Sequence, residues 1–264
     1  MVGMKYVVCY SGGHSSALAA IETVRRYGKD KVILLNHDIS PKVERADTKE
    51  YKERIADKLG LPVQYANAEG WEDRTPLVVA REKRLFQKLA GQKFCTYELK
   101  TKPFYDWIKT SGYTGDDVTF VYGFDAKETE RIERRRMILG KMGFETLFPL
   151  AELPRTIFDT KEIGVEKPVS YCQFKHSNCV GCLKAGKMHW YMVYCLYPEI
   201  FAEAVFTEKS VGQTIIKGVW LEDLIPLYEE MKQQNIEPSD NCVCSSFWKS
   251  VRDTAIGQQD LLEL

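Results

Sequence analysis

The segment at residues 4–18 constrains the fold of this chain more than any other. An apolar run leads into Ser-Gly-Gly at residues 11–13, and residues with helical spacing follow directly. This order predicts a strand, a tight glycine turn and the N-terminus of a helix. Glycine permits the positive φ angles of such a turn, and the N–H groups and dipole of a helix N-terminus favour an anion. The expected ligand is a phosphate group, most simply that of a nucleotide.

The first 150 residues show a pattern in which strands alternate with helices. Further apolar runs lie at 31–36, 63–66, 118–122 and 144–148, and segments with helical patterns lie at 44–59, 77–89, 102–110 and 128–142. Strands separated by helices are typical of a parallel α/β sheet with right-handed crossovers. We therefore expect residues 1–150 to form an α/β domain that binds a nucleotide.

The pattern changes after Pro149. No comparable strand run follows, and six of the eight cysteines lie in this part of the chain. Helical patterns are found at 187–196, 199–207 and 221–234. The sequence thus predicts that residues 151–264 form a mainly helical, cysteine-containing appendage.

Composition narrows the class of protein further. The chain has 264 residues, 44% of them hydrophobic, and Lys+Arg balance Asp+Glu at 37 each. This balance does not indicate nucleic-acid binding, although a local basic patch would suffice for it. Because no signal region and no run of about 20 apolar residues is found, we expect no membrane contact and a cytoplasmic location. In that compartment the cysteines are expected to be thiols or metal ligands.

The glycine turn matches one known phosphate-binding pattern better than the others. It is neither a Walker loop nor a GxGxxG turn. It resembles the PP-loop of ATP pyrophosphatases and 3′-phosphoadenylyl sulfate (PAPS) reductases, Ser-Gly-Gly-x-Asp-Ser, with Ser15 in the place of the Asp. The resemblance implies a Rossmann-like (HUP/PP-loop) fold and a phosphate cradle made by Ser11, Gly12, Gly13, Ser15 and Ser16.

Three polar side chains are expected beside this cradle, each with an alternative. His14 offers an imidazolium that could face a phosphate and act in catalysis, or is an exposed turn residue. Asp38 follows the strand at 31–36, where a carboxylate commonly takes a ribose hydroxyl or a metal; otherwise it caps a helix. Lys100 belongs to residues 93–103, which resemble the Cys-x-x-x-Leu-Lys-x-x-Pro element of PAPS-reductase-like proteins. There it would face an anion, unless the segment is a solvated charged turn.

Residues 122–131 resemble a second element of the same family, Gly-x-x-x-x-Glu-Ser-x-x-Arg. Gly123, Glu128 and Arg131 match it, and Thr129 stands in the Ser position. The resemblance places Gly123 and Glu128 at the nucleotide. Arg131 is a catalytic candidate, because a guanidinium pairs bidentately with phosphate or sulfate. Most of the following charged helix is interpreted as a solvated, salt-bridged face.

The cysteines suggest a metal or cluster site. Cys179 and Cys182 form a Cys-x-x-Cys turn, a spacing that lets two thiolates bind one metal. The family element implies Cys95 as a third ligand, and Cys172 or His176 could be a fourth. Three thiolates suit a [4Fe–4S] cluster with one open iron, as in the tRNA 2-thiocytidine synthetases that this chain resembles. Four suit structural zinc, and metal-free thiols remain a third alternative.

The ordered motifs, over about residues 4–210, resemble the PAPS-reductase-like branch of the adenine nucleotide α-hydrolase-like superfamily. The resemblance implies an ATP pyrophosphatase that forms AMP in sulfur transfer or thiolation, with ATP, Mg²⁺ and a cysteine-ligated cluster. Reduction of PAPS or adenylyl sulfate is the alternative; the Glu-Cys-Gly-Leu-His-like tail of those reductases is not found, and the Cys242/Cys244 pair matches it poorly. A non-catalytic nucleotide sensor with structural zinc is a second alternative. Expected partners are an adenine nucleotide and a sulfur-donor protein, with a nucleic-acid acceptor and a homodimer left open.

Overall fold

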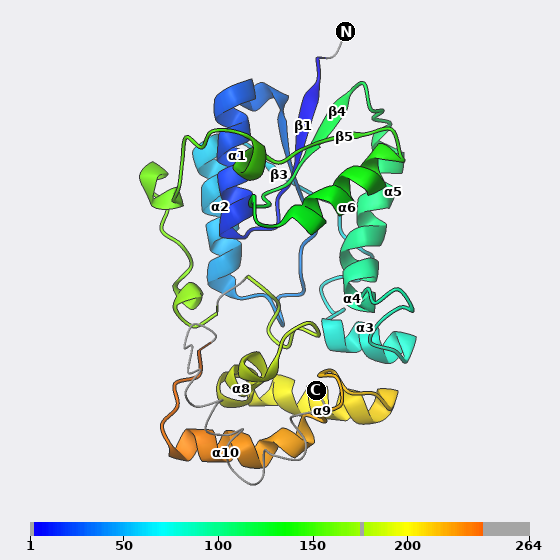
Figure 1. Cartoon of the computed structure of the whole chain (residues 1–264), viewed down its shortest axis with the longest axis vertical. Coiled ribbons are helices and arrows are strands. Elements are labelled where there is room, and N and C mark those ends of the chain that lie inside the picture. Colours follow the sequence, from blue (N-terminus) through cyan, green and yellow to red (C-terminus); the bar gives the residue numbers. More distant parts are fainter. Residues whose placement is uncertain (1–2, 175–176, 240–264) are drawn as a thin grey trace. The chain divides into compact units, whose positions relative to one another are not determined.

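The computed structural model describes residues 3–174 and 177–239. Its strands form one five-stranded parallel sheet (Figure 1). The strand order is β3-β2-β1-β4-β5. The strands are β1 Lys5–Cys9, β2 Val32–Asn36, β3 Val63–Tyr65, β4 Val118–Val121 and β5 Glu145–Leu147. All neighbours pair in parallel, with Val7 of β1 opposite Ile33 of β2 and Phe120 of β4. The predicted α/β class and its five strands are confirmed.

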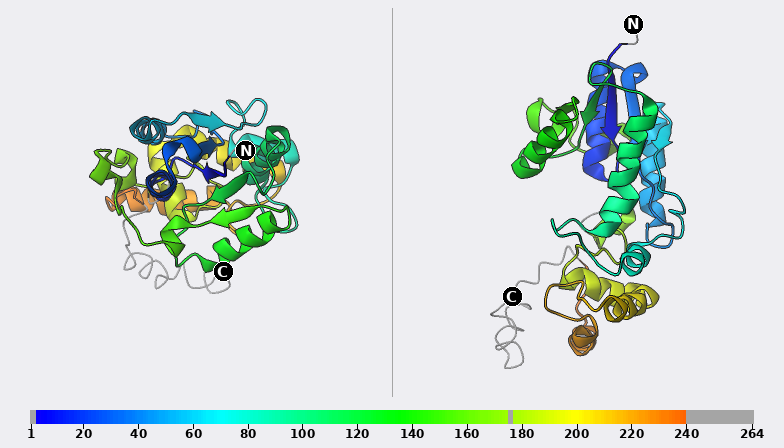
Figure 2. Two further views of the ribbon diagram at one scale, coloured as in Figure 1. Left: turned by 90° about the horizontal axis from the view of Figure 1, so that it is seen from above. Right: turned by 90° about the vertical axis from the view of Figure 1, so that its right-hand side faces the viewer.

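Helices cover both faces of this sheet. The helices α1 His14–Tyr27 and α2 Ala46–Leu59 pack on one face, and α5 Lys102–Ser111 and α6 Thr129–Gly140 pack on the other (Figures 1 and 2). Alternate residues of a strand pack against the helices on opposite faces of the sheet, because successive side chains of a strand point to opposite faces. Val8 contributes to the layer under α1 and α2, and Val7 to the layer under α5 and α6. The chain reverses its direction of travel across the sheet between β1 and β4, which is where open sheets of this kind bind ligands.

The contacts divide the described chain into two compact units. The first, called here the sheet unit, comprises the residues up to Asp73 and Thr96–Ser170; the second, the helical unit, comprises Arg74–Cys95 and the described residues from Tyr171 onward. The boundary expected near residue 150 lies inside the sheet unit. A segment rich in loops therefore belongs with the strands that precede it.

The physical reason is a set of hydrogen bonds that ties residues 151–170 to α1 and α2. The buried carboxylate of Glu22 accepts hydrogen bonds from the Ile157 amide at 3.1 Å and from the Thr156 hydroxyl at 3.1 Å. Tyr51 Oη donates to Thr160 Oγ1 at 3.0 Å. The helix α7 Pro149–Glu152 overlaps the start of this segment, a 3₁₀ turn lies at Thr160–Ile163, and another, Val169–Cys172, crosses its end. A further 3₁₀ turn, Lys29–Lys31, precedes β2.

The helical unit has a core of its own, in which aromatic side chains such as Trp190, Phe201 and Tyr228 pack among aliphatic ones. Its helices are α3 Pro76–Lys83, α8 Lys187–Leu196, α9 Pro198–Val211 and α10 Ile225–Gln233, with a 3₁₀ turn at Glu222–Leu224 before α10. The helix α3 belongs to this unit because its Arg81 donates hydrogen bonds to two side chains of α9, Glu203 Oε1 at 2.7 Å and Thr207 Oγ1 at 2.6 Å.

Two helices of this unit are shorter than expected. The segment predicted as a helix at 77–89 ends at Lys83, because Arg84 adopts the left-handed conformation with φ of 52°. The residues beyond it form a turn closed by an antiparallel bridge between Gln87 and Lys93. The helix predicted from 221 begins at Ile225, after the 3₁₀ turn. Among the described residues, no helix combines the length and apolar character needed to cross a bilayer.

Candidate functional site

The loop between β1 and α1 has the conformation that its glycines predict. Gly12 has a φ of 78°, and Gly13 is the N-cap of α1 with no side-chain cap. The first turn of α1 contains no acidic residue, so the positive end of the helix dipole is not compensated there. Ser16 Oγ donates to Gly13 O at 2.8 Å and accepts from Ser11 Oγ at 3.1 Å, which closes the loop on itself.

The side chains of Ser11 and Ser15 are exposed, whereas Gly12 and Ser16 are buried. The loop therefore presents two hydroxyl groups beside the N-terminus of a 14-residue helix, at the carboxyl end of the central strand. This is the geometry expected of a phosphate cradle.

A buried lysine lies directly beneath the cradle. The Lys52 side chain is 1% exposed, and a Cβ atom added to Gly12 would lie 3.2 Å from Lys52 Cδ. The Lys52 ammonium group is 2.9 Å from Asp38 Oδ1, 3.4 Å from Asn36 Oδ1 and 3.9 Å from Glu44 Oε1. Lys49 Nζ takes the other Asp38 oxygen at 3.0 Å. Two lysines and two carboxylates thus form one network under the loop.

This network fixes the charge of Asp38 and perturbs that of Glu44. Burial works to raise the pKa of Asp38, but the ion pairs with Lys52 and Lys49 prevail and lower it. Burial is the main cause that raises the pKa of Glu44. Glu44 Oε2 finds no hydrogen-bond donor among the described residues. Both oxygens of Asp38, which the sequence suggested for a ribose or a metal, are engaged by lysines, and α2 begins only at Ala46, so Asp38 is not a helix cap either.

The end of β4 meets the cradle through a glycine. A Cβ atom at Gly123 would lie 2.5 Å from the carbonyl oxygen of Ser15 and 2.8 Å from the amide nitrogen of Ser16. Only a residue without a side chain allows this approach of two backbones, so the structure gives Gly123 a packing role beside the cradle.

The predicted pair of Glu128 and Arg131 is brought together, but in contact with each other. Arg131 forms an ion pair with Glu128, and its guanidinium carbon lies 4.1 Å from the centre of the Phe124 ring. Glu128 Oε2 also accepts a hydrogen bond from the Asp125 amide at 2.9 Å, which closes the turn before α6. The Arg131 side chain is 63% exposed. An anion would therefore have to compete with Glu128 for it.

His14 faces the segment that follows β5. Its Nε2 lies 3.8 Å from Asp159 Oδ1, and Lys167 Nζ lies 2.6 Å from Asp159 Oδ2. Burial, with Lys167 acting in the same direction, lowers the pKa of His14 below its ordinary value. The imidazole is thus mainly neutral at pH 7, and the expected imidazolium facing a phosphate is not what this environment favours.

Lys100 reaches the same end of the sheet from a turn of π-helix, Tyr97–Thr101, which follows the short α4 Phe94–Thr96 and leads into α5. Its charge is one cause of the lowered pKa of His37, the residue after β2; burial is the largest cause. His37 Nδ1 lies 2.5 Å from the carbonyl oxygen of Ala66, after β3. Lys100 is exposed, so its ammonium group is available to an anion above the carboxyl ends of the strands.

Replacing Lys100 by glutamine is expected to raise the pKa of His37, because one of the charges that disfavour the imidazolium form is removed. An NMR titration of the His37 ring protons measures this directly. The Lys102→Gln variant removes the same charge two residues away and should leave the titration unchanged. A His37 pKa that does not respond to Lys100→Gln would contradict the placement of Lys100 at this edge.

The four cysteines suggested as metal ligands belong to the helical unit, and the cradle belongs to the sheet unit. Cys95, Cys179 and Cys182 are partly buried, and Cys172 is exposed. Cys95 and Cys182 both act on the pKa of Lys93, which burial lowers and these thiols raise, so the two thiols lie near one ammonium group. The Cys182 amide lies 3.4 Å from Nε2 of the buried His189, a further donor that the sequence did not single out.

These donors do not form a ready metal site. Within residues 3–174 and 177–239, no three His, Cys, Asp or Glu side chains converge closely enough to hold an ion. His176, Cys242 and Cys244 lie outside the described residues. The [4Fe–4S] cluster and the structural zinc ion therefore stay predictions from the cysteine spacing.

The main feature that the sequence analysis missed is the lysine network under Gly12. A signal was present: Lys52 lies beside Tyr51 on the stripe that continues through Ile55, and this stripe is the buried one. A charged residue on a buried stripe requires a charged partner nearby.

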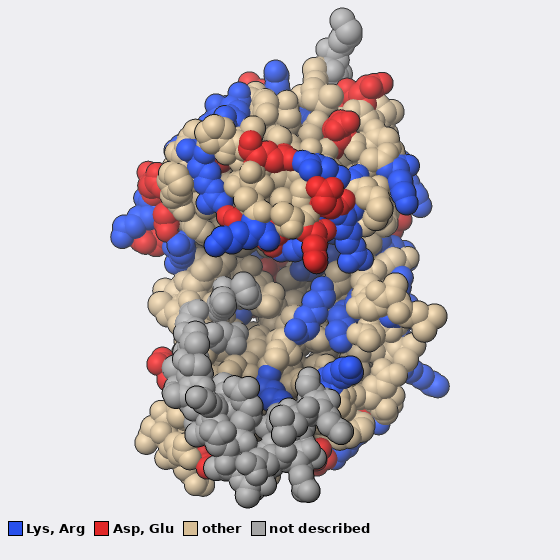
Figure 3. Space-filling model, viewed as in Figure 1, with Lys and Arg blue, Asp and Glu red and all other residues tan. Residues whose placement is uncertain are grey.

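On the face of the sheet unit seen in Figure 3, acidic and basic side chains are interspersed, in keeping with the balanced composition.

Comparison with models of known protein families gave no match, and comparison with curated proteins gave none either. The site is therefore interpreted from its own geometry and from the motifs of the sequence. Together these define an all-parallel α/β protein with an uncapped glycine loop above its central strand.

Proposed function

We propose that this chain is an adenine-nucleotide enzyme of the PP-loop type, which cleaves ATP between its α and β phosphates and forms AMP. The observation that carries the proposal is the uncapped N-terminus of α1 behind a glycine of positive φ, at the carboxyl end of the central strand. A helix start of this length, without its own acidic cap, supplies several parallel N–H donors to an anion. The order of the motifs supports an adenine nucleotide as the ligand.

In this proposal the phosphates of MgATP, the substrate, lie against the amides of residues 13–16. The Ser11 and Ser15 hydroxyls are exposed on the loop and would donate to the same oxygens. Lys52 acts from below: its stem supports Gly12, and its ammonium group is engaged by Asp38, so it positions the loop and leaves phosphate binding to the amides.

The chemical step is an in-line displacement at the α-phosphorus. An oxygen of the acceptor forms a bond to the α-phosphorus as the bond to the bridging oxygen of the β-phosphate breaks, and the bridging electron pair leaves with pyrophosphate. The charge that develops on pyrophosphate is stabilised by the α1 dipole and by Lys100. Displacement of AMP from the adenylated acceptor by a sulfur nucleophile would complete a sulfur transfer, the class that the motifs indicate.

The proposal is tested with MgATP radiolabelled at the α-phosphate, with and without sulfide as the sulfur donor and RNA or DNA as trial acceptors. We expect labelled AMP and an equal amount of pyrophosphate. Lys100→Gln should lower the rate roughly tenfold, because it removes one charge that acts on the leaving group. Lys102→Gln, which removes the same charge outside the cradle, is the matched control.

Other outcomes identify the alternatives. Release of sulfite from PAPS with a thiol donor would indicate a reductase in place of an ATP pyrophosphatase. Shifts of the Gly12 and Gly13 amide signals on adding ATP, without any AMP, would indicate a nucleotide sensor. If neither ATP nor PAPS moved those two amide signals, the phosphate cradle itself would be refuted. Iron, sulfide and zinc analysis after anaerobic purification tests the cluster separately.

A further inference from the structure

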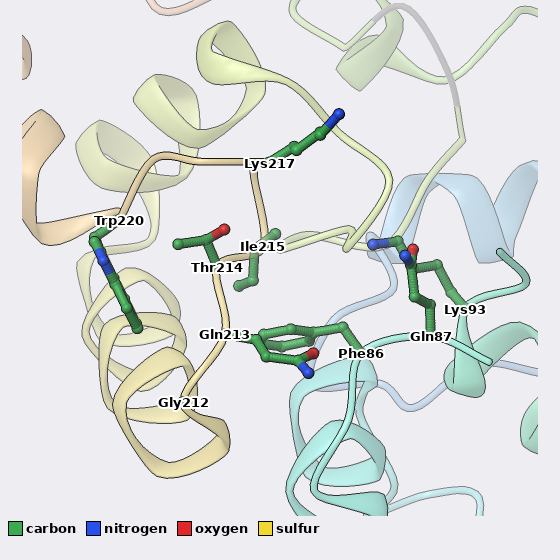
Figure 4. A pocket seen from close by; sticks show the side chains of 9 residues that line it. All are labelled: Phe86, Gln87, Lys93, Gly212, Gln213, Thr214, Ile215, Lys217 and Trp220. Atoms are coloured by element: carbon green, nitrogen blue, oxygen red, sulfur yellow. The ribbon is translucent and has the colours of Figure 1, made fainter. Parts of the chain in front are cut away.

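A second site is suggested by a cavity of about 520 Å³ inside the helical unit. Two loops line it, the turn at 86–93 and the loop at 212–220, and it is open to solvent between them (Figure 4). The volume lies within the range of about 300–1,000 Å³ that is typical of small-molecule sites. We propose that this cavity binds a nucleotide unit, an aromatic base that carries a phosphate, independently of the phosphate cradle in the sheet unit.

The loop at 212–220 is held in place by one buried carboxylate. Glu208 of α9 is 1% exposed, and its two oxygens accept hydrogen bonds from the Ile215 and Leu221 amides, each at 2.7 Å. Within the loop, Thr214 Oγ1 accepts a hydrogen bond from the Gly218 amide at 3.2 Å. Because both ends of the loop are fixed to a rigid helix, the cavity is formed before any ligand arrives.

The opposite wall is equally well defined. Gln87 and Lys93 form an antiparallel bridge, and the Phe94 amide donates to the Phe86 carbonyl at 3.1 Å. Phe86 is 2% exposed and belongs to the aromatic core of the unit, so its ring is an anchored part of the wall. Figure 4 labels Phe86 and Gln213 among the residues that line the cavity, with Gln87 and Lys93 on the two arms of the turn.

The lining has the chemistry of a site for an aromatic anion. Its nine residues include Lys93 and Lys217 and contain no Asp or Glu, in this part of the described chain. Lys93 is partly buried, so its ammonium group is incompletely hydrated and gains from a bound anion. Trp220 lines the cavity and is 38% exposed, so part of its ring is accessible to a ligand. A base can stack on it, because every base presents a π-face.

Uncharged polar groups complete the lining of the cavity. The amides of Gln87 and Gln213 and the Thr214 hydroxyl are placed to bond to the edge of a base or to a ribose. A purely inorganic anion would leave the ring of Trp220 and these amides unused. A neutral aromatic molecule would leave two lysines unused. A nucleotide unit uses both sets.

Such a unit could come from a free mononucleotide or from the end of a nucleic-acid strand. The test therefore uses two probes with the full chain, uridine 5′-monophosphate and a 5′-phosphorylated tetrauridylate; uridine and inorganic phosphate are the partial ligands. The readout is the indole N–H signal of Trp220 in NMR spectra, assigned with Trp220→Phe, together with equilibrium dialysis. Pyrimidine probes avoid the adenine nucleotides proposed for the cradle.

We expect at least one of the two nucleotide probes to shift the Trp220 signal, and to bind more tightly than either partial ligand. Trp220→Leu should weaken binding roughly tenfold through loss of stacking. Lys217→Gln should weaken it about threefold, with a smaller dependence on salt. Lys209→Gln, which removes an exposed charge paired with Glu222 elsewhere on the unit, should leave it unchanged.

Binding of the mononucleotide identifies a free nucleotide as the source, and binding of the tetrauridylate alone identifies a strand end. If neither probe moves the Trp220 signal, or if inorganic phosphate has the same effect as both, the proposal is overturned. Lys217 is a surface residue, so its variant keeps the test valid even if Trp220→Leu fails to fold. The amide signals of Gly12 and Gly13 report the cradle separately, so failure here is distinguishable from failure of the proposed function.

Discussion

Replacing Lys52 by methionine is expected to destabilise the sheet unit by about 3–5 kcal/mol, the usual cost of removing one member of a buried ion pair. Methionine fills the volume of the lysine stem but leaves Asp38 with one lysine and Glu44 with a weaker set of partners. Both carboxylates are largely buried, so hydration cannot replace the interaction with the Lys52 ammonium group. Denaturant unfolding of the variant and the wild type at pH 7 measures the difference.

The loss should shrink in acid. In the wild type, Asp38 has a lowered pKa in the folded state, so its contribution is present above its unfolded pKa of about 3.9 and is lost as the pH falls through the folded value. In Lys52→Met the pKa values of both Asp38 and Glu44 rise, and protonation relieves their uncompensated charge. The gap between the two proteins should therefore be smaller at pH 4.5 than at pH 7.

Lys49→Met is the matched control, since Lys49 bonds to the same carboxylate from a side chain that is 35% exposed. Its loss should cost no more than about 1 kcal/mol. Equal effects of the two substitutions would contradict the buried network, because they would mean that burial makes no difference to the pair.

The architecture of the sheet unit could be predicted because its signals are local. Each strand is a short apolar run, and each helix follows with its own stripe, as in α2 with Tyr51 and Ile55. The alternation of strand and helix patterns along the chain then predicts a parallel sheet, and the glycine turn after β1 indicates its ligand-binding edge. The observed strands differ from the expected runs by at most two residues at either end.

The extents of the two units could not be predicted, because they depend on single contacts between distant residues. Glu22 accepts hydrogen bonds from the backbone at 156–157, and Arg81 donates to α9. Nothing in the sequence around either residue indicates which distant residue it contacts. Composition changes after Pro149, but composition does not reveal that a loop-rich segment is tied back to α1 and α2. Likewise α3 has an ordinary helical pattern, and its contacts with distant residues, such as the ion pair with Glu203, assign it to the helical unit.

The candidate site divides in the same way. The conformation of the loop at 11–16 follows from its own residues and was predicted. The partners of Asp38 and His14 were not, because each partner comes from another element: Lys52 of α2 and Asp159 after β5. A motif identifies the residue types at a site, whereas the charges around them decide which are available to a ligand.

Replacing Gly123 by alanine is expected to have the largest effect on activity. The added Cβ atom would lie 2.5 Å from the Ser15 carbonyl oxygen and 2.7 Å from its carbonyl carbon, and both are backbone atoms that no side-chain rotation can move. The end of β4 and the start of α1 must separate, which should destabilise the sheet unit by about 1–3 kcal/mol. A shift of this kind at the amides of residues 13–16 should lower ATP turnover roughly 100-fold.

Gly140→Ala provides the control, because a Cβ atom at Gly140 meets nothing within 4 Å and the residue closes a helix of the same unit. That variant should be as stable as the wild type or more stable by about 0.5–1 kcal/mol. Unfolding and ATP turnover separate the two parts of the argument. A stable, active Gly123→Ala protein would show that the two backbones do not approach as closely as described. A destabilised variant with normal turnover would confirm the packing role and refute the cradle as the site of catalysis, because a displaced helix start cannot hold the phosphates as before.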